Sequence, residues 1–600
     1  MAAHTGSPPG PELSRQRRQA GPRLDPDTAE YFRRALETLE EGLSEEELAL
    51  FTPNVLSEAA LASPALALTP LGCRLLLLLL PRAPPSALPP FLGALPGVPT
   101  HPRGSRVLQA ALGRIPGVLG EAPGLLEEPL ARLAREVATE PGGLARDPNG
   151  SFVLRALLGV LGGTGDAVPP PEGAEPKVKK AWPPQKGVWP LQKEAWPPQK
   201  GAELPASFRP LLEELAEGLE REMPSLLAPP CASLCLQGAL FALHRSQSPS
   251  CSRFCRALIG CLARHGPAHP QSPLLTSLQD PARSRLLEAA MTVLDPPGLR
   301  ELFRGHLRGH LRGVASHRVA NHGLQRLLDH APEDVVEEAL SELGPALQEP
   351  LARGHPGVVV ALLGAAQRHP RLQGAALRWL FQALRCWDPP HHPHCVTALA
   401  QLRPLGGGDS DEKAEPEGKG AELEGKGAEP EVKGAEPEAK GAEPHPFPIP
   451  TLWGSLALQL LLSFGDPSPI WGSLGSLPPP ALLGLARSPP GSRIWDSILG
   501  SPGAPPRARR RLLRKLQGHW PSLARDRSGS RVLDAAWASG RPRQRARMAE
   551  ELAPHLPDLL RDPLGRGVAR NLGLELFKKD PEKWAELQRG AGLGGRGLIL

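Results

Sequence analysis

A pair of polar side chains four residues apart recurs along the chain, each time just after a turn. In "DPNGSFVLRALLGVL" (147–161) the pair is Ser151 and Arg155, and Phe152 stands between them. Residues i and i+4 lie one turn apart on the same face of a helix. Two polar groups so placed can reach the edge of one base, while the side chain after the first can stack on its plane. This is how a helical repeat reads unpaired RNA.

The same arrangement occurs ten times, and we call its first residue the anchor. The anchors are Ser105, Ser151, Ser233, Ser284, Asn321, Gly357, Ser455, Ser492, Ser530 and Arg566. The residues four positions later are Gln109, Arg155, Gln237, Glu288, Gln325, Ala361, Gln459, Asp496, Asp534 and Arg570. The residues directly after the anchors include Arg106, Phe152, Arg285, His322, Arg493 and Arg531. All the polar and stacking members are candidate RNA contacts, and Gly357 with Ala361 has no reading groups.

Local structure offers an alternative explanation of the anchors. Ser and Asn are preferred at helix N-caps, and a preceding Gly is ordinary turn chemistry. Capping alone would not place a polar or charged residue four positions on in nine of the ten copies. We therefore favour an RNA-reading surface, and expect these side chains to line one exposed inner wall. A generic helical scaffold is the alternative.

The elements that must position these residues are helical repeats. Five pairs of consecutive anchors lie 36–38 residues apart, and each unit reads as a helix, a turn and a second helix beginning at the anchor. Such a unit cannot bury its apolar face alone, so neighbours must stack. We predict an all-α solenoid of about ten or eleven units, with one degenerate unit around 376–402.

Two low-complexity segments interrupt the repeats. Residues 165–204 repeat "AWPPQKG", and residues 406–445 repeat "KGAE" with no apolar seam, so both are predicted to be disordered linkers. The predicted organisation is a disordered tail (1–28), repeats (29–164), a linker (165–204), repeats (205–405), an acidic linker (406–447), repeats (448–578) and a C-terminal tail (579–600).

Charge indicates a polyanionic partner. The chain carries a formal charge of +6, and the acidic segment 406–445, with 12 Asp or Glu and 5 Lys, leaves +13 on the remainder. Residues 507–547 hold 13 Lys or Arg and 2 Asp. A folded part this basic favours nucleic acid.

Other chemistries find little support. The eight cysteines form no CxxC pair, and Cys231/Cys235 and Cys251/Cys255 have the spacing of buried helix positions. His391, His392, His394 and Cys395 are interrupted by Pro393 and are expected in a loop, so no metal or cofactor is predicted. The "LLLLLL" run (75–80) is too short to cross a bilayer, and no signal peptide opens the chain. No nucleophile elbow, P-loop or HExxH motif is present, so we expect no enzyme.

The repeated units resemble pumilio (PUF) repeats, and most closely the divergent branch of that family in small-subunit ribosome assembly. The stretches that carry the resemblance are "YFRRALETL" (31–39), "NGSFVLRALLGVLGGT" (149–164), "ANHGLQRLLD" (320–329), "GHPGVVVALLGA" (354–365), "GSRVLDAAW" (529–537) and "LRDPLGRGVARNLGL" (560–574). The resemblance implies an eleven-repeat, C- or U-shaped solenoid in the nucleolus. It would bind single-stranded and structured pre-ribosomal RNA together with small-subunit particle proteins, and support 18S rRNA processing without catalysis.

The pumilio base code, carried over by this resemblance, assigns bases to several units. Ser284/Glu288 would favour guanine and Asn321/Gln325 uracil. Ser105/Gln109, Ser233/Gln237 and Ser455/Gln459 would favour adenine. Ser492/Asp496 and Ser530/Asp534 depart from the code.

Two other functions remain as alternatives. One is a cytoplasmic pumilio-type mRNA regulator, and the other is a HEAT- or armadillo-like protein scaffold. Nuclear import would be read from "RARRRLLRK" (507–515).

Overall fold

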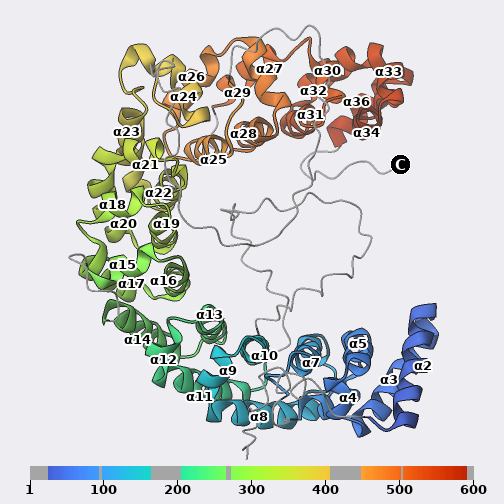
Figure 1. The fold of residues 1–600 in the computed structure, drawn as a ribbon. Helices are drawn as coiled ribbons and strands as arrows, with labels where there is room; N and C mark the ends of the chain where they lie inside the picture. The colour runs from blue at the N-terminus through green and yellow to red at the C-terminus, as the bar shows by residue number, and fades with distance from the viewer. Residues whose placement is uncertain are drawn as a thin grey trace, which may run out of the picture. The chain divides into compact units, whose positions relative to one another are not determined.

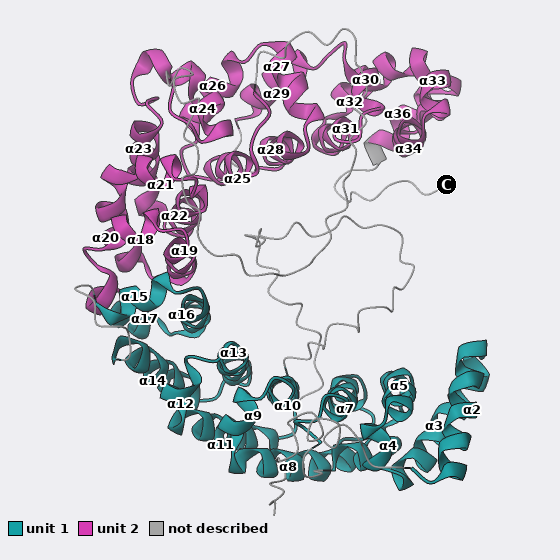
Figure 2. Ribbon diagram, in the orientation of Figure 1, with its two compact units in different colours: residues 1–302 teal, residues 303–600 magenta. Residues whose placement is uncertain are grey.

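The computed structural model describes residues 24–93, 98–163, 204–264, 272–405, 448–501 and 505–590. Within these ranges the regular elements are all helices, so the all-α prediction is confirmed. The chain divides into two compact units, residues 1–302 and 303–600 (Figure 2). Most of both predicted linkers lies outside the described residues.

Most repeats consist of a first helix, a short helix and a second helix, and within each unit the second helices stack in a row (Figure 1). In the unit of residues 1–302 the second helices are α5 (Pro70–Leu79), α7 (Gly104–Val118), α10 (Gly150–Leu161), α13 (Pro230–Arg245) and α16 (Pro281–Val293). The first helices are α3 (Glu45–Leu61), α8 (Pro123–Thr139), α11 (Phe208–Arg221) and α14 (Ser250–Arg264). The short helices are α4 (Ala65–Leu68), α6 (Pro89–Leu92), α9 (Pro141–Arg146), α12 (Met223–Leu226) and α15 (Pro273–Gln279), and α2 (Pro26–Glu41) and α17 (Pro296–Leu302) lie at the unit's two ends.

The unit of residues 303–600 repeats this arrangement. Its second helices are α19 (Ala320–His330), α22 (Pro356–Arg368), α25 (Leu452–Leu461), α28 (Pro489–Gly500), α31 (Gly529–Ser539) and α34 (Pro563–Leu572). First-helix positions hold the π-helical turn η3 (Phe303–Leu307), α20 (Glu333–Leu343), α23 (Gln373–Ala383), α26 (Ser468–Ser476), α29 (Pro506–Lys515) and α32 (Pro542–Leu552). The short helices are α18 (Leu311–Ser316), α21 (Gln348–Ala352), α24 (Cys395–Gln401), α27 (Pro479–Arg487), α30 (Trp520–Ala524) and α33 (Leu556–Arg561), and α35 (Leu574–Lys579) and α36 (Pro581–Gly590) follow.

Stacking buries the apolar faces that a single repeat would leave in water. On α10, Val153, Leu154, Leu157 and Leu158 are all fully buried, and the helix contacts both α7 and α13. Burying one such side chain contributes about 1.5–3 kcal/mol. The core is therefore continuous along each unit rather than centred in it, as expected of a repeat stack.

A glycine stands directly before six of the ten anchors and lets the second helix start directly over the preceding short helix. A Cβ on Gly72 or Gly491 would lie 2.1 Å from the carbonyl oxygen of Leu66 or Leu485, six residues earlier. Gly454 makes the same approach, but to the carbonyl of Ala400, 2.0 Å from its would-be Cβ. The acidic segment is thus inserted within a single turn, between α24 and α25.

This relationship corrects the predicted degenerate unit around 376–402. Helices α23 and α24 are the first and short helices of the repeat that ends in α25, so that range is not a unit of its own. An additional second helix lies instead at α5, which packs against α7. Its anchor position holds Cys73, followed by Arg74, and Leu75, Leu76 and Leu79 of the leucine run are fully buried.

Two smaller predictions concern possible metal ligands and membrane spans. His391, His392 and His394 lie on a 3-10 helix, η6 (Pro389–His394), and Cys395 begins α24, so the predicted loop is wrong. Across the described residues, no group of His, Cys, Asp or Glu is placed to hold a metal ion. Among the helices of those same ranges, none has the length and apolarity needed to cross a membrane.

Candidate nucleic-acid interface

In nine of the second helices named above, the side chain that accepts N–H groups at the helix start is not the anchor but the residue four positions before the anchor position. The Asp147 carboxylate accepts the Gly150 N–H at 2.6 Å, and the Asp526 carboxylate accepts the Gly529 N–H at 2.7 Å. Equivalent bonds are made by Thr69, His101, Asp280, His317, Thr451, Ser488 and Asp562. The second helices accordingly begin one to three residues before the anchor, not at it. Capping therefore does not explain why the anchors are small and polar.

Most anchors are buried, which corrects the expectation that they line an exposed wall. Ser105, Ser151, Ser233, Ser284, Asn321, Ser455 and Ser492 are between 1 % and 4 % exposed, and Gly357 is also buried. Ser530 is half-buried and Arg566 is exposed. The reason is the close packing of neighbouring second helices. The Ser455 hydroxyl, for example, donates to the carbonyl of Pro490 on α28 at 2.6 Å.

Four buried anchors hold the side chain four residues later in place. Ser284 Oγ donates to Glu288 Oε1 at 2.6 Å, and Gln325 Nε2 donates to Asn321 Oδ1 at 2.8 Å. Gln459 and Gln237 donate to Ser455 and Ser233 at 3.0 and 3.3 Å. Glu288, Gln325, Gln459 and Gln237 are half-buried, so they keep polar atoms toward solvent. The surface that could contact a base is thus this second residue, oriented by the first.

The remaining pairs are arranged differently. Gln109 is buried, at 6 % exposure. Ser151 Oγ donates to Pro148 O, Ser492 Oγ to Pro489 O, and Ser530 Oγ to Arg527 O. Arg566 Nε donates to Leu560 O at 3.0 Å, and Arg570 is exposed.

Several residues directly after the anchors, which were predicted to stack on bases, are exposed. Arg106, Arg285, His322, Arg493 and Arg531 are exposed, and Phe152 is 49 % exposed. On α10 the Arg155 guanidinium lies 4.5 Å from the centroid of the Phe152 ring, a cation–π contact between two predicted site residues.

Charge is partly balanced at the two Ser/Asp units. Asp496 lies 4.0 Å from both Arg493 and Arg531, which extends from the next second helix. Burial raises the pKa of Asp496, and the two arginines oppose that rise. Burial also raises the pKa of Asp534.

Sequence reasoning missed two groups of residues at this surface. Cys73 and Arg74 occupy the anchor and stacking positions of α5, and "GCR" in place of "GSR" was the available signal. The capping histidines were also missed. Burial, together with Arg103 and Arg318, lowers the pKa of His101 and His317, which keeps each Nδ1 free to accept a hydrogen bond.

A side-chain cap, a small or polar anchor four residues later and a stacked second helix recur in both units, although individual repeats depart from this arrangement. The family model of the NOP9-like PUF repeat domain matches residues 120–567, and that of the Pumilio-family RNA binding repeat matches residues 100–117. The chain belongs to the NOP9-like PUF repeat family. The predicted pumilio resemblance is confirmed.

Two mammalian relatives and two solved structures show the extent of the similarity. The chain is 37 % identical to human Nucleolar protein 9 over 97 % of this chain and 92 % of that one, and 36 % identical to the mouse protein over 97 % and 91 %. It shares the fold of the APUM23–GGAAUUGACGG structure, with a TM-score of 0.72 and 22 % identity over 94 % of this chain and all of that one. A form of APUM23 lacking its insert region matches with a TM-score of 0.70 and 22 % identity over 95 % of this chain and all of the other.

Proposed function

We propose that this protein binds pre-ribosomal RNA in the nucleolus and supports processing and assembly of the small subunit, without catalysing a reaction. The family assignment carries the RNA-binding and nucleolar parts of this proposal, since the relatives matched over nearly their whole length are named Nucleolar protein 9. Small-subunit pre-rRNA and the proteins of its particle are the partners we propose.

The observation that supports base reading best is the arrangement of four second helices, in which a buried anchor fixes the half-buried polar side chain four residues later. On α16, Arg285 is exposed, Glu288 is half-buried, and buried Ser284 fixes the Glu288 carboxylate. An arginine plane stacks on a base, while a carboxylate only accepts hydrogen bonds. The Watson–Crick edge of guanine carries N–H donors, so this unit is suited to guanine. The predicted base choices at the other pairs stay proposals.

The test removes both functional groups from one unit. We expect Arg285→Ala/Glu288→Ala to weaken binding to a single-stranded RNA containing guanine by about 1–3 kcal/mol, the range for one stacked base. The matched control is Arg132→Ala/Glu136→Ala on the first helix α8, where both residues are exposed. Filter binding of the purified chain measures both. Equal affinity of the two variants would contradict base reading at α16.

A second experiment distinguishes the proposed RNA from other partners. Crosslinking the protein to RNA in cells and mapping the positions should recover small-subunit pre-rRNA. Crosslinks confined to mRNA, with protein outside the nucleolus, would support a cytoplasmic regulator instead. An absence of RNA crosslinks would favour a protein-binding scaffold.

A further inference from the structure

The strongly basic segment of residues 507–547 does not lie mainly on the second helices. Its arginines are concentrated on two first helices, α29 and α32, while α31 between them in sequence carries Arg531. First and second helices form separate rows in this unit (Figure 1). The basic surface is therefore distinct from the base-reading positions.

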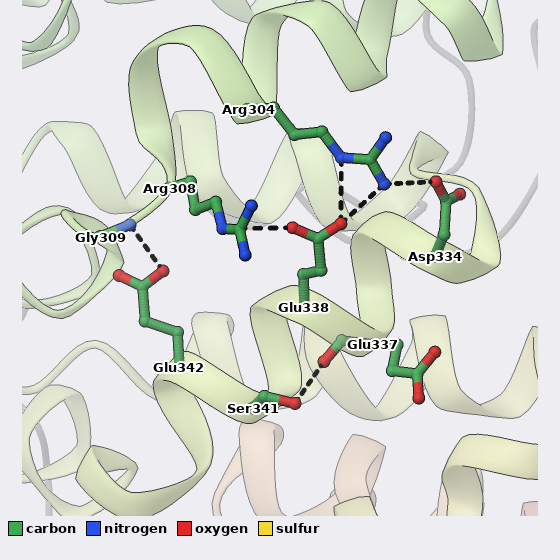
Figure 3. A network of polar contacts seen from close by, with 8 residues as sticks. All are labelled: Arg304, Arg308, Gly309, Asp334, Glu337, Glu338, Ser341 and Glu342. Atoms are coloured by element: carbon green, nitrogen blue, oxygen red, sulfur yellow. Dashed lines mark hydrogen bonds and ion pairs between the residues drawn. The ribbon is translucent and has the colours of Figure 1, made fainter.

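A comparable pair of first helices elsewhere in the unit neutralises its arginines. Arg304, on η3, donates to Glu338 at 2.6 and 3.0 Å and to Asp334 at 2.8 Å, and Arg308 lies 3.4 Å from Glu338 (Figure 3). Glu342 accepts the N–H groups of Gly309 and Leu311 at 2.8 and 2.7 Å. Acids spaced four residues apart on α20 thus face the preceding repeat.

An equivalent hydrogen bond shows which residue of α32 corresponds to Glu342 of α20. Glu551 accepts the Trp520 N–H at 2.9 Å, as Glu342 accepts that of Leu311. Both bonds follow a histidine N-cap and a glycine with positive φ, +86° at Gly518 and +83° at Gly309.

Four and eight residues before Glu342 stand Glu338 and Asp334. Four and eight residues before Glu551 stand Arg547 and Arg543. Arginines therefore occupy the positions of the neutralising acids.

The result is a surface of uncompensated arginines, which we call the outer arginine surface. It consists of Arg507, Arg510, Arg511, Arg514, Arg543 and Arg547, all exposed. None of the six makes an ion pair with an acid in the part of the chain that the structure describes. Positions 507, 511 and 514 follow the i, i+4, i+7 spacing of one helix face.

We propose that the outer arginine surface binds the phosphate backbone of double-stranded RNA, independently of its sequence. This inference rests on the proposed function, because it assumes RNA as the partner. Guanidinium groups suit phosphate geometry. Neither α29 nor α32 carries an aromatic side chain on which an unpaired base could stack. A duplex presents its phosphates and keeps its bases stacked, so it matches a surface that has charge alone.

The test restores the acids seen on α20. Arg543→Asp/Arg547→Glu reproduces the Asp334 and Glu338 pattern, and gives α29 acids with which to pair. We expect this variant to lose at least tenfold in affinity for a perfect RNA duplex of about 16 base pairs, the length that a double-stranded RNA domain spans. Its affinity should also depend less steeply on salt. Binding to single-stranded RNA should change less than twofold.

The control replaces an exposed pair elsewhere, Arg221→Asp/Arg256→Glu on the first helices α11 and α14, with the same change in charge. A second test variant, Arg510→Gln/Arg514→Gln, leaves α32 intact, and thermal unfolding checks that each variant is folded. Equal duplex affinity of the control and both test variants would overturn the proposal. So would loss of binding to a polyglutamate peptide with duplex binding unchanged, since the partner would then be an acidic protein. If the wild-type chain bound neither single-stranded nor duplex RNA, the proposed function itself would fail.

Discussion

Gly357 lies directly against the amide of Gln325, the proposed base-contacting residue of the preceding second helix. A Cβ at Gly357 would stand 2.6 Å from Gln325 Oε1 and 2.7 Å from its Nε2. The unit without polar groups of its own thus makes room for the pair beside it. Its missing side chain has a structural role at the neighbouring unit.

Gly357→Ala should therefore change RNA selectivity more than stability. The end of a flexible side chain can move aside at little cost, but doing so breaks the 2.8 Å bond between Gln325 and Asn321. We expect a change in unfolding free energy below about 1 kcal/mol and a weaker preference for uracil at this unit. Competition binding with RNAs that differ in one base measures the preference. Gly364→Ala, on the same helix with open space around it, is the control.

Removing the cap of α16 should lower stability, whereas removing its anchor side chain should lower RNA affinity. Asp280→Ala removes the acceptor for two helix N–H groups and should cost about 1 kcal/mol of unfolding free energy. Ser284→Ala leaves the cap intact but frees the Glu288 carboxylate, so RNA affinity should fall. Chemical denaturation and RNA binding of both variants check this. If Asp280→Ala lowered the affinity as much as Ser284→Ala did, the two roles would not be distinct.

Acid should weaken the two helices capped by histidine. The folded-state pKa of His101 and of His317 is lowered, so their contribution to stability is fully present above the ordinary histidine pKa of about 6.5 and is lost as pH falls below it. A doubly protonated ring has no acceptor for the Gly104 or Ala320 N–H. We expect His101→Asp/His317→Asp, which copies the aspartate caps, to lose less stability between pH 7 and 5. Parallel denaturation curves at both pH values would be evidence against histidine capping.

Phe152→Ala should weaken RNA binding with little effect on folding. The ring is about half-exposed and contacts Arg155, so its removal costs little core packing. Loss of a stacked base should reduce the binding free energy by about 1–3 kcal/mol. Filter binding at two salt concentrations separates this from a charge effect. Phe241→Ala, an exposed phenylalanine on α13, is the control.

The repeat period and the all-α fold were predictable, because apolar spacing recurs along the chain and a turn glycine precedes six of the ten anchors. The distinction between Asp147 and Ser151 was not, because both are good caps and only the hydrogen bonds show which one caps. Burial of Ser284 or Ser455 was also not predictable from spacing, since it depends on the neighbouring helix. The α5 unit escaped detection because Cys73 replaces serine and Leu77 replaces the second polar residue. The range 376–402 was misassigned because an insertion hides the contact between Ala400 and Gly454.

That contact makes one turn of the protein open to engineering. Thr451 N–H bonds to Ala400 O at 2.9 Å, so the chain leaves α24 and enters α25 at adjacent points. A fluorescent domain or an affinity tag could replace residues 406–447 without spreading the two helices that flank it. The protein thus offers an internal insertion site for a fusion domain, away from both chain ends.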